Sequence, residues 1–222
     1  IVLDEVKHNN QDGAYCNYEI VQPTKETVFS VDELKKKSVD DILLSRFAPY
    51  NGKTYRQICD MLNIEPSSSK SKYFIVSNVI AGKGNVCNVN KSEEFEKSGL
   101  TMKTIRVKKT GVIKESMSFE NIDYQEVFDC EEWTDSRLYE LFTNRFLFVI
   151  FCETDNVLHL PNGRTEPEYK LEKVAFWTMP QDDLKVAQEY WSNIRQNVLD
   201  NHIAPQYFWN AKADRYFHVR PK

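Results

Sequence analysis

The residues best suited to chemistry lie in one short stretch, residues 94–107 (EFEKSGLTMKTIRV). Glu94 precedes the turn pair Ser98-Gly99, and Lys103 follows on a segment whose alternating residues predict a hairpin strand. A carboxylate before such a turn and an acid two residues ahead of a lysine can together hold Mg²⁺, while the lysine reaches the same phosphate or water. Here Thr101 stands where that second acid would be. The pattern therefore predicts a metal-site hairpin that has lost one of its ligands.

Length and composition indicate one large globular domain, or one domain with an extension. The chain has 222 residues, of which 41% are hydrophobic and 13% aromatic, enough for a sizeable core. It begins with Ile1, so we expect it to be a piece of a longer chain. We find no signal peptide and no bilayer-spanning apolar run, which predicts a cytoplasmic protein with no membrane partner.

Cysteine usage argues against a disulfide framework or a zinc site. The five cysteines are scattered, odd in number and form no C-x-x-C pair, and there are only four histidines. A reducing compartment is the expectation that follows.

The charge pattern leaves nucleic-acid binding open. The net charge of −4 argues mildly against it, but basic residues gather locally, and the local field matters more than the total. For each cluster taken alone, an ordinary solvated surface is the favoured interpretation. The clusters are Lys35–Lys37, Lys70 with Lys72, Lys108 with Lys109, and Arg220 with Lys222.

Helical and strand patterns interleave, which predicts an α/β (α+β) domain with a mixed sheet flanked by helices. Residues 1–28 are interpreted as an interdomain linker and residues 29–222 as the domain. The apolar block 73–81 fits a helix or a strand, and residues 65–72 predict a flexible serine-rich loop. Helices are expected from the Ser30–Glu33 capping box to Pro49, over 54–62 and 135–143, and from Pro180; strands are expected over 100–107, 112–119, 146–151, 171–177 and 215–220.

With these elements placed, three stretches resemble the MutH-like endonucleases. They are residues 94–107, the segment 176–180 (FWTMP) leading into a helix with Trp191, and Arg220-Pro221-Lys222 after a strand. The likeness covers roughly residues 30–222, and the hairpin together with the terminal R-P-K is a fairly specific combination. It implies the restriction-endonuclease fold, with a cleft that holds duplex DNA.

The resemblance also implies that the catalytic residues are degenerate. Laid without gaps, the family's helix glutamate falls on Ile80, its first acid on Glu94, its hairpin glutamate on Thr101 and its lysine on Lys103. A further family lysine falls near residues 141–143, which contain none. One carboxylate of three is a poor Mg²⁺ site. We therefore expect no metal and no catalysis in this domain, with Mg²⁺ needed only by the catalytic domain of the parent enzyme, a site-specific deoxyribonuclease.

The implied DNA contacts come from the basic residues. In the family the R-P-K loop reads GATC, so Arg220 and Lys222 are the candidates for guanine O6 and N7, with Pro221 fixing their backbone. By the same likeness, Lys72 is expected at a phosphate or base. Lys103, Lys108 and Lys109 are expected at the DNA backbone.

Within the family the chain is most similar to the C-terminal domain of a GATC-specific type II restriction endonuclease. It is then expected to bind double-stranded DNA containing GATC and to act as an allosteric effector of a catalytic N-terminal domain in the same chain, with dimerisation on DNA as a further expectation. Two alternatives stay open. One is an active Mg²⁺-dependent endonuclease whose rearranged site adds Glu93 or Glu115 to Glu94; the other is a scaffold for the catalytic half.

Overall fold

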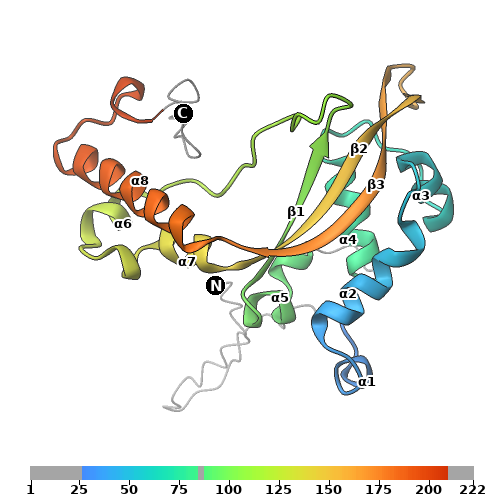
Figure 1. Ribbon diagram of the computed structural model, residues 1–222, viewed down its shortest axis with the longest axis horizontal. Coiled ribbons are helices and arrows are strands. Elements are labelled where there is room, and N and C mark those ends of the chain that lie inside the picture. Colours follow the sequence, from blue (N-terminus) through green and yellow to red (C-terminus); the bar gives the residue numbers. More distant parts are fainter. Residues whose placement is uncertain (1–26, 85–87, 210–222) are drawn as a thin grey trace, which may run out of the picture.

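The computed structural model describes residues 27–84 and 88–209 and is built around a three-stranded sheet. The strand order is β1-β2-β3, with β1 parallel to β2 and β2 antiparallel to β3. Helices flank this mixed sheet, which confirms the predicted fold class (Figure 1). The strands are β1 (Leu100–Val107), β2 (Arg145–His159) and β3 (Thr165–Thr178).

The helices divide between two parts of the molecule. Figure 1 shows α2, α3 and α4 beside the sheet and α6, α7 and α8 gathered on the other side. The helices are α1 (Val31–Leu34), α2 (Val39–Phe47), α3 (Tyr55–Leu62), α4 (Lys72–Ala81), α5 (Glu93–Lys97), α6 (Tyr124–Asp129), α7 (Arg137–Thr143) and α8 (Gln181–Leu199). Short 3-10 turns are η1 (Ala48–Tyr50), η2 (Val89–Lys91), η3 (Trp133–Asp135) and η4 (Pro205–Tyr207).

The main core lies between the sheet and helices α2 to α4. Alternate residues of each strand face it because successive side chains of a strand point to opposite faces. Tyr73 of α4 packs against rings from α3, β2 and β3, with ring centroids 4.9 Å from Phe151, 5.2 Å from Tyr55 and 5.5 Å from Tyr169. The strand residues buried in this core are Leu100, Met102, Leu147, Val149, Phe151, Leu158, Tyr169 and Leu171.

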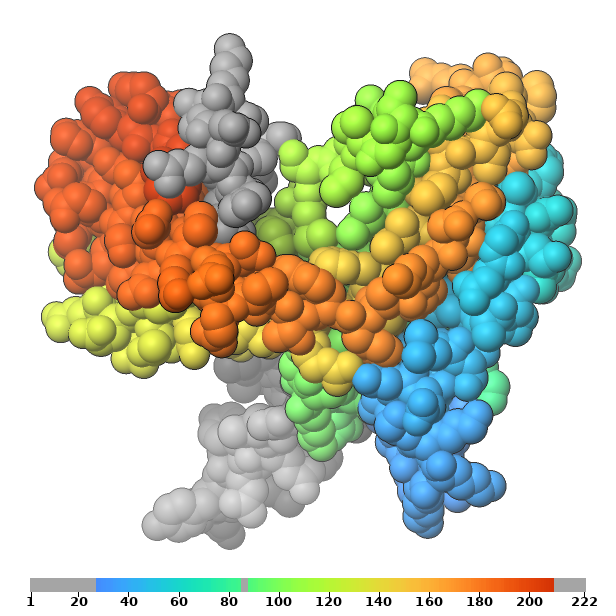
Figure 2. Space-filling view, in the orientation of Figure 1, coloured from blue at the N-terminus to red at the C-terminus, as the bar shows by residue number. Residues whose placement is uncertain are grey.

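A second core belongs to the helical part. Trp133, Leu141, Phe142, Met179, Ala187 and Trp191 form one buried cluster, and Val127, Tyr190, Ile194 and Phe208 form another. The two parts are joined by the long β2–β3 ribbon, since α7 leads into β2 and β3 leads into α8. In Figure 2 the α6–α8 part and the sheet part stand as two lobes of the surface.

Local caps explain where several helices begin. Ser30 and Glu33 form the predicted capping box, with Glu33 N donating to Ser30 Oγ at 3.2 Å and Ser30 N to Glu33 Oε2 at 3.0 Å. The helix predicted to continue from there to Pro49 is wrong in its middle. It ends at Leu34, and α2 begins anew because Ser38 accepts a hydrogen bond from Asp41 N at 3.2 Å and acts as a second N-cap.

The hairpin predicted over residues 94–107 is also wrong in its first half. Residues 93–97 are the short helix α5, which a turn at Gly99 connects to β1. Gly99 has φ of 57°, and a Cβ there would lie 3.3 Å from Asn144 Oδ1, so glycine suits both the conformation and the space.

The returning strand predicted over 112–119 does not form. Only one isolated bridge joins Val107 and Ile113, and β1 pairs instead with the apolar β2. The other edge of β1 is partly covered by Asn90, whose side-chain amide accepts from Met102 N at 2.7 Å and donates to Met102 O at 3.1 Å. A side chain thus takes the place of a fourth strand at this point.

The remaining element predictions fare better. Block 73–81 is helical in α4, and the strand expected at 146–151 forms the N-terminal half of the longer β2. The helix expected from Pro180 is α8, with Pro180 as its N-cap and Asp182 and Asp183 in its first turn, where the helix dipole favours acids. The strand expected at 215–220 lies outside the described residues. Across the described ranges, every helix is too short or too polar to span a bilayer.

Candidate functional site

Glu94, the acid of the predicted metal site, binds backbone N–H groups instead. Its carboxylate accepts hydrogen bonds from Val28 N at 3.0 and 3.2 Å and from Phe29 N at 3.1 Å. Arg46 completes the grip, because its Nη2 donates to Val28 O at 3.0 Å and its guanidinium lies 4.7 Å from the centre of the Phe29 ring. We call Glu94 and Arg46, with the Val28–Phe29 backbone between them, the clamp.

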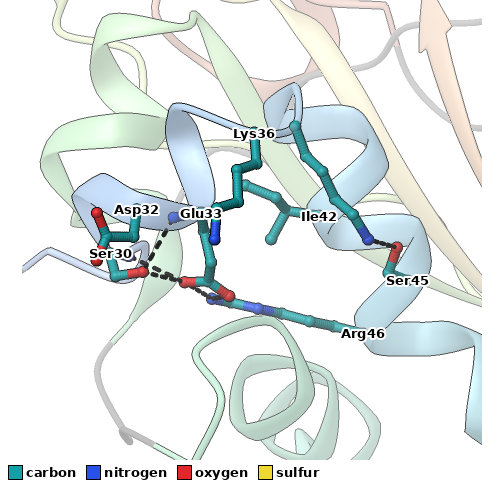
Figure 3. Close-up of a pocket in the computed structure, with 8 residues that line it drawn as sticks. Ser30, Asp32, Glu33, Lys36, Ile42, Ser45 and Arg46 are labelled. Carbon is teal, nitrogen blue, oxygen red and sulfur yellow. Dashed lines mark hydrogen bonds and ion pairs between the residues drawn. The ribbon is translucent and has the colours of Figure 1, made fainter.

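A pocket of about 290 Å³ adjoins the clamp, between α1 and α2 (Figure 3). Figure 3 shows the Glu33 carboxylate between Ser30 and Arg46. The Ser30 backbone hydrogen bond lowers the pKa of Glu33 to about 2, and the Ser30 hydroxyl and Arg46 act in the same direction against partial burial. Glu33 and Arg46 are thus paired with each other within the fold. The lining residues are Ser30, Asp32, Glu33, Lys36, Lys37, Ile42, Ser45 and Arg46.

The two positions where the resemblance predicts acids are placed differently. Ile80 lies on α4, is 3% exposed and packs in the main core. A carboxylate at this position would be buried among apolar side chains. Thr101 is half-buried on the opposite face of β1, in register with Phe146 of β2. Within 27–84 and 88–209, no three His, Cys, Asp or Glu side chains come together as a metal-binding group.

These residues do not fit Mg²⁺. The ion requires several oxygen ligands in near-octahedral order, usually with one or two carboxylates among them. Both oxygens of Glu94 already accept backbone N–H groups, Ile80 has no oxygen to offer, and Thr101 offers only a neutral hydroxyl. The other acids considered have partners too. Glu93 pairs with Lys97. Glu115 accepts from Arg106 Nε at 2.7 Å and from Arg106 Nη2 at 2.6 Å.

Lys103 lies on the second face of β1 and is largely covered. Its Nζ donates to Ser118 O at 2.8 Å and lies 4.7 Å from the centre of the Phe119 ring. Burial lowers the pKa of Lys103, and the nearby Glu120 charge opposes this. Phe119 in turn packs edge-on against Phe142 and Phe146. Lys103 therefore fastens the segment 112–123 across this face of the sheet.

Lys72 requires a correction to the predicted exposed loop contact. It is the first residue of α4 rather than part of a loop, is 2% exposed, and forms an ion pair with Glu166 of β3. Its ammonium also lies 5.9 Å from the centre of the Tyr55 ring and 5.6 Å from that of Tyr73. A phosphate could reach Lys72 only by displacing Glu166.

The other two lysines expected at the DNA backbone lie on a turn after β1. Lys108 and Lys109 are exposed, and Gly111 closes the turn with φ of 80° and a 2.8 Å hydrogen bond from its N–H to Lys108 O. Lys109 Nζ reaches Asp155 of β2 at 2.5 Å. Arg220, Pro221 and Lys222 lie outside the described residues, so their proposed base contacts remain a prediction.

Sequence reasoning missed one group of residues altogether. Arg106, Lys114 and Glu166 gather with Lys72 around three tyrosines at one end of the main core. They come from four separate segments, so no spacing in the sequence links them.

Comparison with known proteins finds a family match over the sheet region. Residues 84–189 match the family described as the DNA mismatch repair enzyme MutH, a range that includes α5, β1, β2 and β3. The chain is also 31% identical, over 162 residues, to a type II restriction enzyme, Sau3AI from Staphylococcus aureus. That alignment covers 68% of this chain and 31% of the relative, so the chain spans about a third of the relative's length.

Proposed function

Since residues 84–189 form a MutH-family domain with a restriction-endonuclease-like fold, we propose that the chain is a DNA-binding domain related to type II restriction enzymes whose own nuclease site is lost. One observation carries this proposal. Glu94 is the sole acid left at the three family carboxylate positions, and it binds the Val28 and Phe29 amides. A fold that keeps its sheet while its metal ligands are lost or reassigned is suited to binding rather than cutting.

We propose further that the DNA contains GATC. The candidates for base reading are Arg220 and Lys222, whose donors match guanine O6 and N7, with Pro221 fixing the loop. Lys108 and Lys109 on their exposed turn would contact the DNA backbone. Lys103 would join them if the segment 112–123, which covers it, moves away when DNA binds. Cytoplasmic location follows from this role and is part of the proposal.

The same proposal assigns the domain an effector role toward a catalytic half of the same chain, with dimerisation on DNA as a further possibility. The clamp supports this idea, because it grips the chain where the proposed linker, residues 1–28, joins the domain. If binding DNA alters the clamp, the linker would sense it, and the coupling would be reciprocal.

The decisive experiment is a band-shift with a GATC duplex and a scrambled duplex at fixed salt, on the whole chain and on a truncation after Val219. We expect the whole chain to prefer GATC and the truncation to lose most of that preference, by about 1–3 kcal/mol per good base contact. Equal binding of both duplexes by the whole chain would contradict sequence-specific binding. Binding of neither would favour the scaffold reading.

A further inference from the structure

Three cationic side chains from three segments converge at one end of the main core. Lys72 comes from α4, Arg106 from the end of β1 and Lys114 from the segment that follows it. The Arg106 guanidinium lies 5.2 Å from the centre of the Tyr73 ring and 5.8 Å from that of Tyr169, and the Lys114 ammonium lies 5.1 Å from the Tyr169 centre.

Two carboxylates share this cluster with them. Glu166 pairs with Lys72, and Glu115 binds the Arg106 fork through both oxygens. Lys114 has no ion pair among the described residues. Burial and the Arg106 charge lower the pKa of Lys114, while the charges of Glu166 and Glu115 oppose this.

Tyr73 adds a polar group without a partner. The residue is 2% exposed, and within the described part of the chain its buried hydroxyl makes no hydrogen bond. Burial raises the pKa of Tyr73, with the Glu166 charge as the next cause, so the hydroxyl remains a donor at any ordinary pH. A buried hydroxyl with no partner destabilises the fold unless something else uses it.

We propose that Lys72, Arg106, Lys114 and Tyr73 form a site for one phosphate group of the DNA backbone, which Glu166 occupies until DNA arrives. The inference rests on the DNA binding proposed above and adds its regulation. A phosphodiester carries the same single charge as the carboxylate, also on two oxygens, but on a tetrahedral rather than a planar group. In place of Glu166 these oxygens would accept from Lys72, Lys114 and the Tyr73 hydroxyl.

The exposures of the two partners indicate which of them moves. The Lys72 side chain is 2% exposed and is held among aromatic rings, whereas the Glu166 side chain is 29% exposed. Glu166 can therefore turn into solvent and regain hydration, while Lys72 stays in place. Because one anion replaces another, the buried ammonium is never left unpaired, which would be strongly destabilising.

The first test is Glu166→Gln, which removes the competing charge and keeps the side-chain size. It also leaves the Lys72 ammonium without its anion, so we expect the free variant to melt at a lower temperature, and affinities are compared at a temperature where both chains are folded. We expect affinity for GATC and scrambled duplexes to rise several-fold alike, and the slope of log affinity against log salt to steepen by up to about one unit. The matched control is Glu172→Gln, which removes one charge from the same strand at an exposed pair with Lys170. The control should change affinity far less.

The second test is Tyr73→Phe, which keeps the ring and removes the hydroxyl. The unliganded chain should melt at the same temperature or higher, because an unsatisfied polar group is gone, while DNA affinity falls several-fold. A tyrosine with a purely structural role would leave DNA affinity unchanged, and that result would count against the phosphate site.

The outcomes separate this inference from the proposed function. A gain by Glu166→Gln on both duplexes supports the phosphate site even if the wild-type chain shows no GATC preference. Wild-type binding with Glu166→Gln no different from Glu172→Gln overturns the site and leaves DNA binding standing, and no binding by any variant overturns both. Melting of Glu166→Gln in inorganic phosphate, against chloride at equal ionic strength, completes the test. If phosphate stabilises Glu166→Gln saturably while this variant binds DNA with the same affinity as the wild type, the site binds free phosphate and the DNA contact is refuted.

Discussion

At the scale of single residues, Glu94 keeps its place in the sequence pattern and has a different task. A carboxylate accepts hydrogen bonds only, and here both oxygens accept from the amides of Val28 and Phe29. Its position could be predicted from the spacing to Lys103. Its partners could not, since they lie 66 and 65 residues away and contribute backbone atoms that carry no sequence signal.

Glu94→Ala should destabilise the chain. The substitution leaves two partly buried backbone donors without their acceptor, which costs about 1–3 kcal/mol for an unsatisfied group. Glu94→Gln keeps one acceptor oxygen and should cost less. Urea unfolding measures both, with the exposed Glu131→Ala as the control. If Glu94→Ala unfolds at the same urea concentration as the control, the clamp contributes nothing to stability.

Glu33 should make the chain sensitive to acid. Its folded pKa is lowered from 4.5 to about 2, mainly by the Ser30 backbone hydrogen bond, so its contribution is present above 4.5 and is lost as pH falls toward 2. The contribution is modest, because the side chain is partly exposed to solvent. Unfolding free energies of wild type and Glu33→Gln should differ above pH 4.5 and converge toward pH 2. A difference that does not change across this range would contradict the assignment.

Restoring one lost acid should not restore cutting. Thr101→Glu returns an acid-x-Lys pair to β1, but Ile80 stays in the core and Glu94 stays in the clamp. Catalytic groups that act as a unit are not recovered one at a time. We expect no nicking of supercoiled GATC plasmid with Mg²⁺ by the wild type or by Thr101→Glu. Robust cleavage by the wild type that Glu94→Ala abolishes would instead establish the rearranged nuclease.

At the scale of elements, local signals predicted what local energetics decide. The capping box at Ser30, the pattern of residues 54–62 and Pro180 correctly placed the starts of three helices. The strand expected over 112–119 failed because pairing is decided by distant residues. Its apolar Val112 and Ile113 are 57% and 58% exposed, whereas β2 offers β1 a buried partner. Lys72 was misplaced for a related reason, since a polar, serine-rich run gives no hint of a buried ion pair.

Lys103 links two elements, and its removal should be felt in both. Lys103→Ala deletes the bond to Ser118 O, so amide exchange across residues 112–123 should speed up. If Lys103 contacts a phosphate in the wild-type complex, Lys103→Ala should bind GATC and scrambled duplexes more weakly by the same factor. The slope of log affinity against log salt should then be shallower by about one unit. Lys108→Ala on the neighbouring exposed turn is the control for exchange. A change in base preference alone would place this strand at the bases rather than at the backbone.

At the scale of the whole molecule, the two lobes share one ribbon, β2–β3, and the clamp lies beside the sheet lobe where the linker enters. Between the proposed phosphate site and the clamp runs α4. Lys72 begins this helix, and Ala81 at its end receives a hydrogen bond from Arg46 of the clamp. A rigid helix with a contact at each end is a physical route for coupling, provided that it has two arrangements.

DNA binding and the clamp should therefore be linked in both directions. A saturating GATC duplex should alter amide exchange at Val28 and Phe29, since displacement of Glu166 at one end of α4 would be transmitted to Arg46 at the other. By reciprocity, if DNA binding changes the stability of the clamp, the state of the clamp must change DNA affinity. Glu94→Ala loosens the clamp without touching the phosphate site, so it should change DNA affinity. Exchange mass spectrometry and band-shifts measure the two sides, and Glu166→Gln should reproduce part of the exchange change without DNA. If DNA leaves Val28 and Phe29 unchanged and Glu94→Ala binds DNA as the wild type does, the domain binds DNA without signalling through its linker, and the effector role would have to use another surface.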